Sequence, residues 1–526
     1  MTLFPRLPLL AALMAVATTV SPGADLQAQP LPPSPAPLPA LGEGVDLPLA
    51  AERRLGDRIA ASIYRDEAYL DDPVLAEYLQ AIWQPLMTAA RNRGEISPEL
   101  QERFAWHLFL LRDRSVNAFA LPGGYLGVHT GLLATVGTPD ELAAVMGHEL
   151  SHVSQRHIAR LFTQQQRQAP WVMAAMILGV MAASRSGSAG SMGNAAIMGG
   201  QALAIQGQLN FSRDMEREAD RVGFGVLTDA GFQPEGVSAM FEKLQLANRF
   251  NDNGSFPYLR SHPLTTERIA EARARVQHSS HAPASERRAA GLPSLAYHAL
   301  MTGRARVLGQ PDAETLQFRL REARQLPASA TPPQRLAAFY AAAWASARLR
   351  DGPQALAWLE RVQVQAAGDA QAARAAQLLG TEIDDMLGRR AEAAAINVSK
   401  ARGRAELLVQ SQALVNAGRG TEVVDPLQSW LSQYPRDPLA WQLLAQGLQQ
   451  QGQAARAVRA DAEGRAAQLD VQGAVDRLKA AQDLLRSGRG EVSGANLHIE
   501  ASIIDSRLRQ LQASIREQAI EDKLNR

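Results

Sequence analysis

Two histidines and a glutamate within five residues give the chain its clearest chemical signal, the sequence His-Glu-Leu-Ser-His at residues 148–152. In a helix, His148 and His152 project from one face about one turn apart, so both imidazoles can bind one Zn²⁺ ion. Glu149 then lies beside the open coordination position, where it can act as a general base. The pattern predicts a zinc hydrolase. Taken alone, its alternative is a surface helix that happens to carry two histidines.

The residues around this motif favour a helix with one buried side. Pro139 and Asp140 form a typical helix start, for which Thr138 or Asp140 can serve as the N-cap. Apolar side chains recur at helical spacing on both sides of the histidines, at Leu142, Val145, Met146, Leu150 and Val153. We therefore expect the buried face of this helix to direct both histidines inward.

A zinc site with two histidines needs a third protein ligand. Glu216 is a better candidate than His157 for this ligand, and it lies in a second predicted helix over residues 212–223. Asp220 shares its face, so it can accept a hydrogen bond from a ligating histidine, which places Asp220 with Glu149 among the candidate catalytic residues. Glu218 points elsewhere. His157 is out of register with longer zinc motifs, and we expect it to be a polar residue near the helix end. Taken alone, a stretch with as many charges as residues 212–223 is more often a solvated helix face.

Four segments of the chain resemble, in the same order, the membrane-associated zinc metallopeptidases that include the CAAX prenyl proteases. These segments are residues 116–133, 148–152, 212–220 and 260–269. The resemblance implies a zincin-like fold that binds one Zn²⁺ per chain. By the same resemblance, His148, His152 and Glu216 are the zinc ligands and Glu149 is the catalytic residue.

The fourth segment contains His262, a candidate fourth ligand or regulatory residue. Pro263 restricts His262 to extended conformations and favours a loop. The family's closing motif folds back toward the active site, so the resemblance places His262 within reach of the metal. We hypothesise that in the resting enzyme His262 occupies the fourth position on zinc and displaces the catalytic water. The alternatives are a cap for the next helix and a hydrogen-bond donor to the transition state.

A β-hairpin is predicted ahead of the zinc helix. Residues 117–120 and 125–128 have strand character and enclose the turn-forming triplet Pro122-Gly123-Gly124. Its outer edge can hold an extended peptide by strand addition, or the hairpin can serve the fold alone.

The N-terminus is typical of a secretory signal peptide over residues 1–28. Arg6 precedes an apolar core at residues 7–20, and small residues continue to Ala28, after which we expect cleavage. A proline-rich linker follows at residues 29–50. The chain has no cysteine, which excludes disulfides and a lipoprotein anchor and fits a bacterial periplasmic protein. Its net charge of +1 argues against nucleic-acid binding as a main role.

The 526 residues are enough for several domains. We expect the zinc metallopeptidase domain at residues 51–290, tetratricopeptide-like helical repeats at 291–495 and a C-terminal docking helix at 496–526. Beyond about residue 290, Ala, Leu, Gln and Arg dominate with helical periodicity. Intervals of 36, 30, 34 and 36 residues, which bracket the length of a tetratricopeptide repeat, separate Gly352, Gly388, Gly418, Gly452 and Gly488.

The expected fold class is therefore α+β but mostly α, a zincin-like domain with a small β-hairpin or sheet followed by an α-solenoid. An irregular helical bundle is the alternative for the second part. Residues 169–184 are uncharged and strongly apolar but shorter than the roughly 20 residues that span a membrane. Two interpretations explain residues 169–184 equally well, a hydrophobic plate that covers the active site and a buried core helix. Such a plate can rest on a membrane or on an unfolded client.

These features predict a periplasmic zinc metalloendopeptidase with a partner-binding repeat domain, in which Glu149 takes a proton from the attacking water. A secreted zinc peptidase domain followed by tetratricopeptide repeats resembles the members of this family that act on outer-membrane β-barrels. That resemblance implies unfolded or misassembled outer-membrane proteins as clients and the β-barrel assembly machinery as a partner. The alternatives are a non-proteolytic chaperone or scaffold, which the complete set of chemical residues disfavours, and a membrane-embedded protease, which the short apolar run disfavours.

Overall fold

The computed structural model describes residues 47–164, 212–249, 256–279, 291–393, 395, 397–488 and 495–524. The predicted signal peptide, nearly all of the proline-rich linker and the apolar run at 169–184 lie outside these residues. Val45–Arg526 form one unit, so the contacts below all lie within it. The expectation of a mostly α-helical chain with a small sheet and a helical C-terminal region is confirmed.

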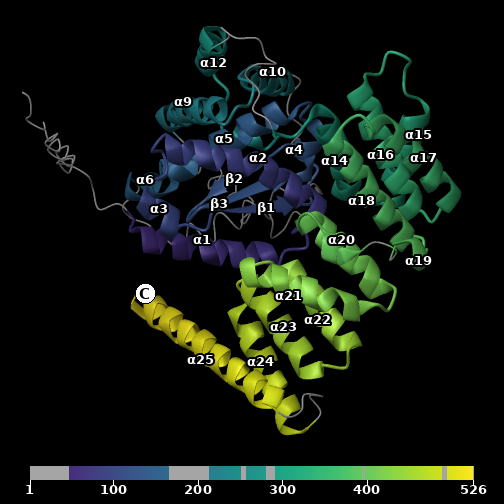
Figure 1. Cartoon of the computed structure of the whole chain (residues 1–526). Helices are drawn as coiled ribbons and strands as arrows, with labels where there is room; N and C mark the ends of the chain where they lie inside the picture. Colours follow the sequence, from purple (N-terminus) through teal and green to yellow (C-terminus); the bar gives the residue numbers. More distant parts are fainter. Residues whose placement is uncertain are drawn as a thin grey trace, which may run out of the picture. The chain divides into compact units, whose positions relative to one another are not determined.

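The part of the chain before residue 290 places helices around a three-stranded sheet (Figure 1). Its strands are β1 (His107–Leu111), β2 (Ala118–Leu121) and β3 (Tyr125–His129). The helices are α1 (Leu49–Tyr64), α2 (Pro73–Asn92), α3 (Pro98–Arg103), α4 (Thr130–Thr135), α5 (Pro139–Ser154), α6 (His157–Gln164), α9 (Arg213–Asp229), α10 (Glu235–Arg249), α11 (Tyr258–Ser261) and α12 (Thr266–Ser279).

The predicted hairpin is formed by β2 and β3, which pair antiparallel with Leu121 opposite Tyr125. Gly123 and Gly124 have φ values of +74° and +89° in the turn, a conformation that favours glycine. The sheet has a third strand that the sequence pattern did not indicate, because β1 pairs with β3 in parallel and gives the order β1-β3-β2.

Helix α5 carries the zinc motif and begins as the sequence predicts. Of the two N-cap candidates, the Thr138 hydroxyl accepts the hydrogen bond from Glu141 N, whereas Asp140 accepts one from Gln233 N. The apolar positions on which the helix was predicted are all buried. Helix α5 packs against α9, α10 and β2.

Two glycines bring α5 and α9 unusually close together. A Cβ atom at Gly223 of α9 would lie 3.0 Å from Gly147 O and 3.1 Å from His148 Cα. The absence of side chains at Gly147 and Gly223 therefore lets the backbones meet beside the motif. This close approach places the acidic residues of α9 next to the histidines of α5.

The second part of the described chain is entirely helical. Its α-helices are α14 (Leu295–Gly309), α15 (Ala313–Arg324), α16 (Pro332–Arg348), α17 (Gly352–Ala366), α18 (Ala370–Met386), α19 (Arg390–Ala393), α20 (Arg404–Asn416), α21 (Val424–Gln433), α22 (Pro438–Gln450), α23 (Ala454–Ala467), α24 (Val471–Arg486) and α25 (Ala495–Leu524). Short 3₁₀ helices are η1 (Val398–Lys400) and η2 (Gly420–Val423). Gly388, Gly418, Gly452 and Gly488 have positive φ just after helices, at the turns that the spacing marked.

The terminal helix α25 packs against α24. Ile504, Leu508 and Leu511 belong to a small apolar cluster with residues of α23 and α24. Ile503, next to Ile504 in the sequence, is exposed.

One hydrophobic cluster crosses the predicted domain boundary near residue 290. It runs from α2 and α5 through α14, α16, α17 and α18 to α20. Arg304 of α14 is buried and forms ion pairs of 2.6 Å with Asp72 and with Glu382. The two parts of the chain therefore share a core, and the boundaries of 51–290 and 291–495 remain a prediction.

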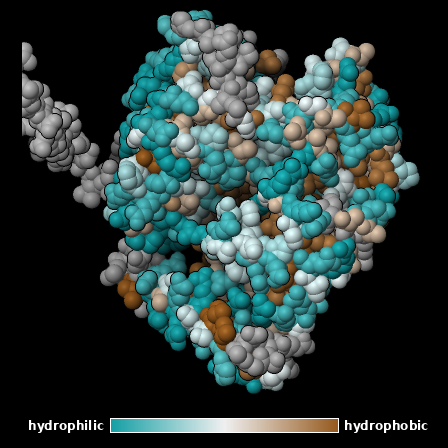
Figure 2. Space-filling view, in the orientation of Figure 1, coloured by the Kyte–Doolittle hydropathy of each residue, from teal (hydrophilic) through white to brown (hydrophobic). Residues whose placement is uncertain are grey.

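The visible surface is largely hydrophilic, with apolar side chains scattered over it (Figure 2). Within the described ranges, no helix combines the length and apolar character needed to cross a membrane.

The shared core contains a histidine that predicts how stability depends on pH. His298 accepts a hydrogen bond from the Tyr78 hydroxyl at Nδ1 and donates from Nε2 to Val136 O at 3.1 Å. Burial lowers the pKa of His298 to about 4. In the unfolded chain the imidazole pKa is about 6.5, so between pH 6.5 and pH 4 the unfolded state binds more protons.

We therefore expect His298 to contribute stability that is fully present above pH 6.5 and is lost as the pH falls to 4. The loss amounts to about 3 kcal/mol of unfolding free energy for this group. Urea unfolding at pH 7 and pH 4.5 measures it, because His298→Gln should show a smaller difference between the two conditions than the wild type. His278→Gln, at an exposed histidine of α12, is the matched control. An equal pH difference in all three proteins would contradict this assignment.

Candidate metal centre

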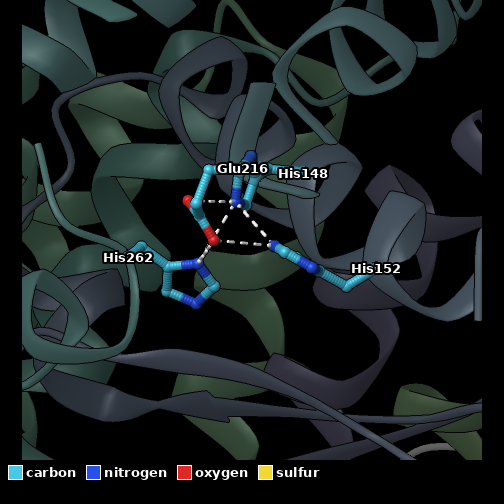
Figure 3. A group of neighbouring side chains, drawn as sticks. All are labelled: His148, His152, Glu216 and His262. Carbon is cyan, nitrogen blue, oxygen red and sulfur yellow. Dashed lines mark hydrogen bonds and ion pairs between the residues drawn. The ribbon is translucent and has the colours of Figure 1, made fainter. Parts of the chain in front are cut away.

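Four side chains converge on one buried point between α5 and α9 (Figure 3). His148 and His152 come from α5, Glu216 from the first turn of α9 and His262 from the residue after α11. One ligand atom from each residue lies within 4.8 Å of the others. The set of imidazole nitrogens and a carboxylate oxygen is what Zn²⁺ prefers in proteins, so these residues fit the metal that the motif predicts.

The distances within this cluster show which atoms face its centre. His148 Nε2 and His152 Nε2 lie 3.0 Å apart. Glu216 Oε2 is 3.5 Å from His148 Nε2, and Glu216 Oε1 is 3.4 Å from His152 Nε2. His262 Nδ1 lies 2.9 Å from Glu216 Oε1 and 3.3 Å from His148 Nε2. The Nε2 atoms of both α5 histidines thus point at the same carboxylate.

Asp220 contacts the opposite ring nitrogen of one histidine. Its Oδ1 lies 3.0 Å from His148 Nδ1, which leaves Nε2 free to face the cluster. Arg268 of α12 lies on the other side of Asp220, with Nε 2.7 Å from Oδ2, and its Nη1 is 2.8 Å from Glu216 Oε2. One guanidinium therefore orients both Glu216 and Asp220, a role for which the sequence offered only a position in the closing motif.

The charges of these groups follow from their neighbours. Burial alone would disfavour the imidazolium of His148, but contacts with Asp220 and Glu216 raise the pKa of His148 to about 10. Burial likewise opposes the charged form of Asp220, yet hydrogen bonds from Arg268 and His148 hold the pKa of Asp220 at about 2. Despite burial, His262 and the two α5 histidines keep the pKa of Glu216 well below its usual range. The two carboxylates are therefore ionised.

Glu149 is fully buried beside the cluster and is not part of it. Its carboxylate faces the Tyr258 side chain. The His262 ring lies near, with Nε2 3.3 Å from Glu149 Oε1. Burial raises the pKa of Glu149, which makes this carboxylate a better proton acceptor than an exposed glutamate.

His157 is buried and lies against His152, whereas we had expected a polar residue near the helix end. Its Nδ1 is 2.8 Å from His152 Nδ1, and its Nε2 is 3.1 Å from Glu218 Oε2. Burial lowers the pKa of His157 to about 4, so the ring is neutral. The i,i+4 pattern could not reveal this contact, because it depends on the turn between α5 and α6.

The hairpin strand β2 packs against α5 next to this centre. Asn117, just before β2, has a side-chain oxygen that is buried without a hydrogen-bond partner in the described chain. The apolar run at 169–184, which we expected to cover the site or to be a core helix, lies outside the described residues.

Comparison with protein families places this centre in a known context. Residues 74–276 match the model of peptidase family M48. This range contains all four segments on which the resemblance was based, from the hairpin to the closing motif.

Three curated relatives show how far the similarity extends. A putative beta-barrel assembly-enhancing protease of Vibrio cholerae is 35% identical over 245 residues, which are 46% of this chain and 48% of that protein. The beta-barrel assembly-enhancing protease of Yersinia pestis is 28% identical over 508 residues, 94% of this chain and 97% of that protein. The mitochondrial metalloendopeptidase OMA1 of Schizosaccharomyces pombe is 30% identical over 164 residues, 31% of this chain and 44% of that protein. The chain thus spans about half the length of the Vibrio cholerae relative, and nearly all of the Yersinia pestis one.

Proposed function

We propose that the chain is a zinc metalloendopeptidase of peptidase family M48, whose model residues 74–276 match, and that it acts on outer-membrane β-barrel proteins in the bacterial periplasm. The observation that carries the proposal is the buried cluster of His148, His152, Glu216 and His262 with Glu149 beside it. His148, His152 and Glu216 would hold the metal.

In this mechanism, Glu149 is the general base. When bound, Zn²⁺ supplies Lewis-acid chemistry and acidifies a water molecule. Glu149 takes a proton from the attacking water at its carboxylate and later gives it to the leaving amine. Its burial supports this role, because burial raises the pKa of the Glu149 carboxyl and makes the carboxylate a stronger base. Asp220 fixes the His148 ring through Nδ1 and acts on the chemistry through that ligand.

The substrate class rests on the relatives and on the N-terminus. The names of the Vibrio cholerae and Yersinia pestis proteins describe proteases that enhance β-barrel assembly. Residues 1–28 have the pattern of a secretory signal peptide, which would bring the chain to the same compartment as unfolded barrels. We assign unfolded or misassembled outer-membrane proteins as clients, the β-barrel assembly machinery as partner, and tetratricopeptide-like helices after residue 290 as the binding region.

Metal removal tests the proposal. Purified full-length protein should contain about one zinc per chain and cleave an urea-unfolded outer-membrane barrel faster than the folded barrel. Dialysis against a chelator should remove both the zinc and the cleavage, and added Zn²⁺ should restore both. Cleavage that persists after complete removal of the metal would contradict the proposal.

His262 gives this site a candidate resting state. Its ring lies between a proposed ligand and the proposed base, with Nδ1 3.3 Å from His148 Nε2 and Nε2 3.3 Å from Glu149 Oε1. We propose that the ring keeps the protease inactive until client binding moves the loop after α11. The capping alternative has less support, because the Thr265 hydroxyl accepts the hydrogen bond from Arg268 N at the start of α12.

We therefore expect His262→Ala to raise basal proteolysis, including self-cleavage, with zinc content unchanged. Initial rates on an unfolded barrel and the amount of intact chain over time measure it. If His262 is instead a hydrogen-bond donor to the transition state, the same variant lowers turnover. An unchanged or lower basal rate in a fully zinc-loaded variant would rule out the inhibitory role.

A further inference from the structure

The turn between α5 and α6 brings His157 back under the zinc helix. Arg156 has a φ of +54°, which reverses the chain after α5. Its guanidinium is anchored by Glu52, with Nε 2.9 Å from Oε2, and by Leu47 O. Because of this turn, the ring of His157 faces His152, five residues earlier, and is fully buried.

The contact between the rings of His152 and His157 requires a hydrogen on one of the two facing nitrogens. Two ring nitrogens 2.8 Å apart form a hydrogen bond only if one donates and the other accepts. His152 presents Nε2 to Glu216 and to His148 in the metal centre, where a ligand needs a lone pair. A neutral His152 ring therefore carries its hydrogen on Nδ1 and donates it to His157 Nδ1.

The remaining contacts of His157 agree with this proton arrangement. With Nδ1 accepting, the hydrogen of the neutral His157 ring is on Nε2, which lies 3.1 Å from Glu218 Oε2. Arg160 Nη1 donates to the same oxygen at 2.7 Å. The donors thus run in one direction, from His152 through His157 to Glu218, and Glu218 is fixed by Arg160 at the partly exposed end.

The two α5 histidines consequently have different partners. His148 Nδ1 faces the carboxylate of Asp220, whereas His152 Nδ1 faces a neutral imidazole. An acceptor behind a metal-binding histidine fixes its tautomer and ring orientation, and its loss weakens metal binding by about 10- to 100-fold. We propose that His157 is the positioning residue for His152 and that Glu218 and Arg160 hold His157 in the accepting tautomer. This inference rests on the proposed zinc site.

The test is the zinc affinity of full-length variants, measured by competition with a chelator of known affinity. His157→Leu removes the acceptor, and zinc binding should weaken by about 10- to 100-fold. His157→Asn places an amide oxygen near the position of Nδ1, so its affinity should return toward the wild-type value. His278→Leu, at an exposed histidine of α12, is the matched control. Thermal unfolding of the metal-free proteins separates metal positioning from a packing role. If His157 serves only packing, variants that bind zinc more weakly should also have lower melting temperatures without the metal. If His157 positions His152, the metal-free melting temperatures should not follow the zinc affinities.

The outcomes decide between the roles. Wild-type affinity in a folded His157→Leu overturns the inference, and so does an equal loss in His157→Asn and His157→Leu, since ring size would then matter and not the acceptor. If His157→Leu does not fold, the Glu218→Ala variant decides. Weaker zinc binding by Glu218→Ala supports the positioning role of His157, and unchanged zinc binding overturns it. A wild-type protein that binds no zinc would instead refute the proposed function, which keeps the two failures distinct.

Discussion

The Glu149→Gln variant is expected to bind zinc as the wild type does and to cleave an unfolded barrel about 10²- to 10⁴-fold more slowly. The amide has the size of the carboxylate but cannot take a proton from the attacking water. Glu149 lies beside the cluster with its Oε1 3.3 Å from His262 Nε2, and the amide oxygen of glutamine can keep this contact, so the substitution leaves the proposed ligands in place. Metal analysis and single-turnover cleavage of the same preparation measure the two properties together.

Glu235→Gln, at an exposed glutamate of α10, is the matched control and should leave both zinc and cleavage unchanged. Loss of zinc from Glu149→Gln would mean that this carboxylate is a ligand. Full cleavage by a zinc-loaded Glu149→Gln would mean that another group is the base. Either result would remove Glu149 from the proposed role.

The zinc helix could be predicted from sequence because its signals are local. Spacing within α5 sets which side chains share a face, and the Thr138 cap and the apolar stripe lie within the same helix. The resemblance to zinc metallopeptidases, carried by four short segments, is confirmed by the match over residues 74–276. The hairpin also depends on adjacent residues, since Gly123 and Gly124 define its turn.

The contacts that complete the centre are long-range, and no local period indicates them. Arg268 reaches Asp220 from another helix, 48 residues further along the chain. His157 reaches His152 through a single positive φ at Arg156, which is not a residue type that marks such a turn. Strand β1 joins the sheet through a parallel pair with β3, and parallel pairing needs a long connection that sequence alternation does not reveal.

The shared core beyond residue 290 was also outside the reach of sequence patterns. Composition changes there, which led us to predict a separate helical domain. In the structure, buried side chains of α14 to α18 continue the cluster of α2 and α5, and the buried Arg304 binds Asp72 just before α2. A helix that is apolar on one face does not show from its own sequence which helix covers that face.

The Glu216→Ala variant is expected to lose zinc far beyond the 10- to 100-fold weakening typical of residues that only support a ligand. Glu216 is the only carboxylate that both α5 histidines face within the four-residue cluster, at 3.5 Å and 3.4 Å from their Nε2 atoms. Its removal leaves imidazoles without the anion that balances a divalent cation. Asp214→Ala, at an exposed position of the same helix turn, should bind zinc as the wild type does.

Thermal unfolding with and without zinc provides a second measurement of this loss. A ligand that binds only the folded state stabilises it by RT ln(1 + [L]/Kd), or about 4 kcal/mol when zinc is at 1,000 times its Kd. Wild type, Asp214→Ala and Glu149→Gln should all gain stability on adding zinc, and Glu216→Ala should gain almost none. Glu218→Ala separates the two glutamates of α9, because Glu218 reaches the centre only through His157. If Glu216→Ala kept the full zinc-dependent gain while Glu218→Ala lost it, the third ligand would be Glu218 and our assignment would be wrong.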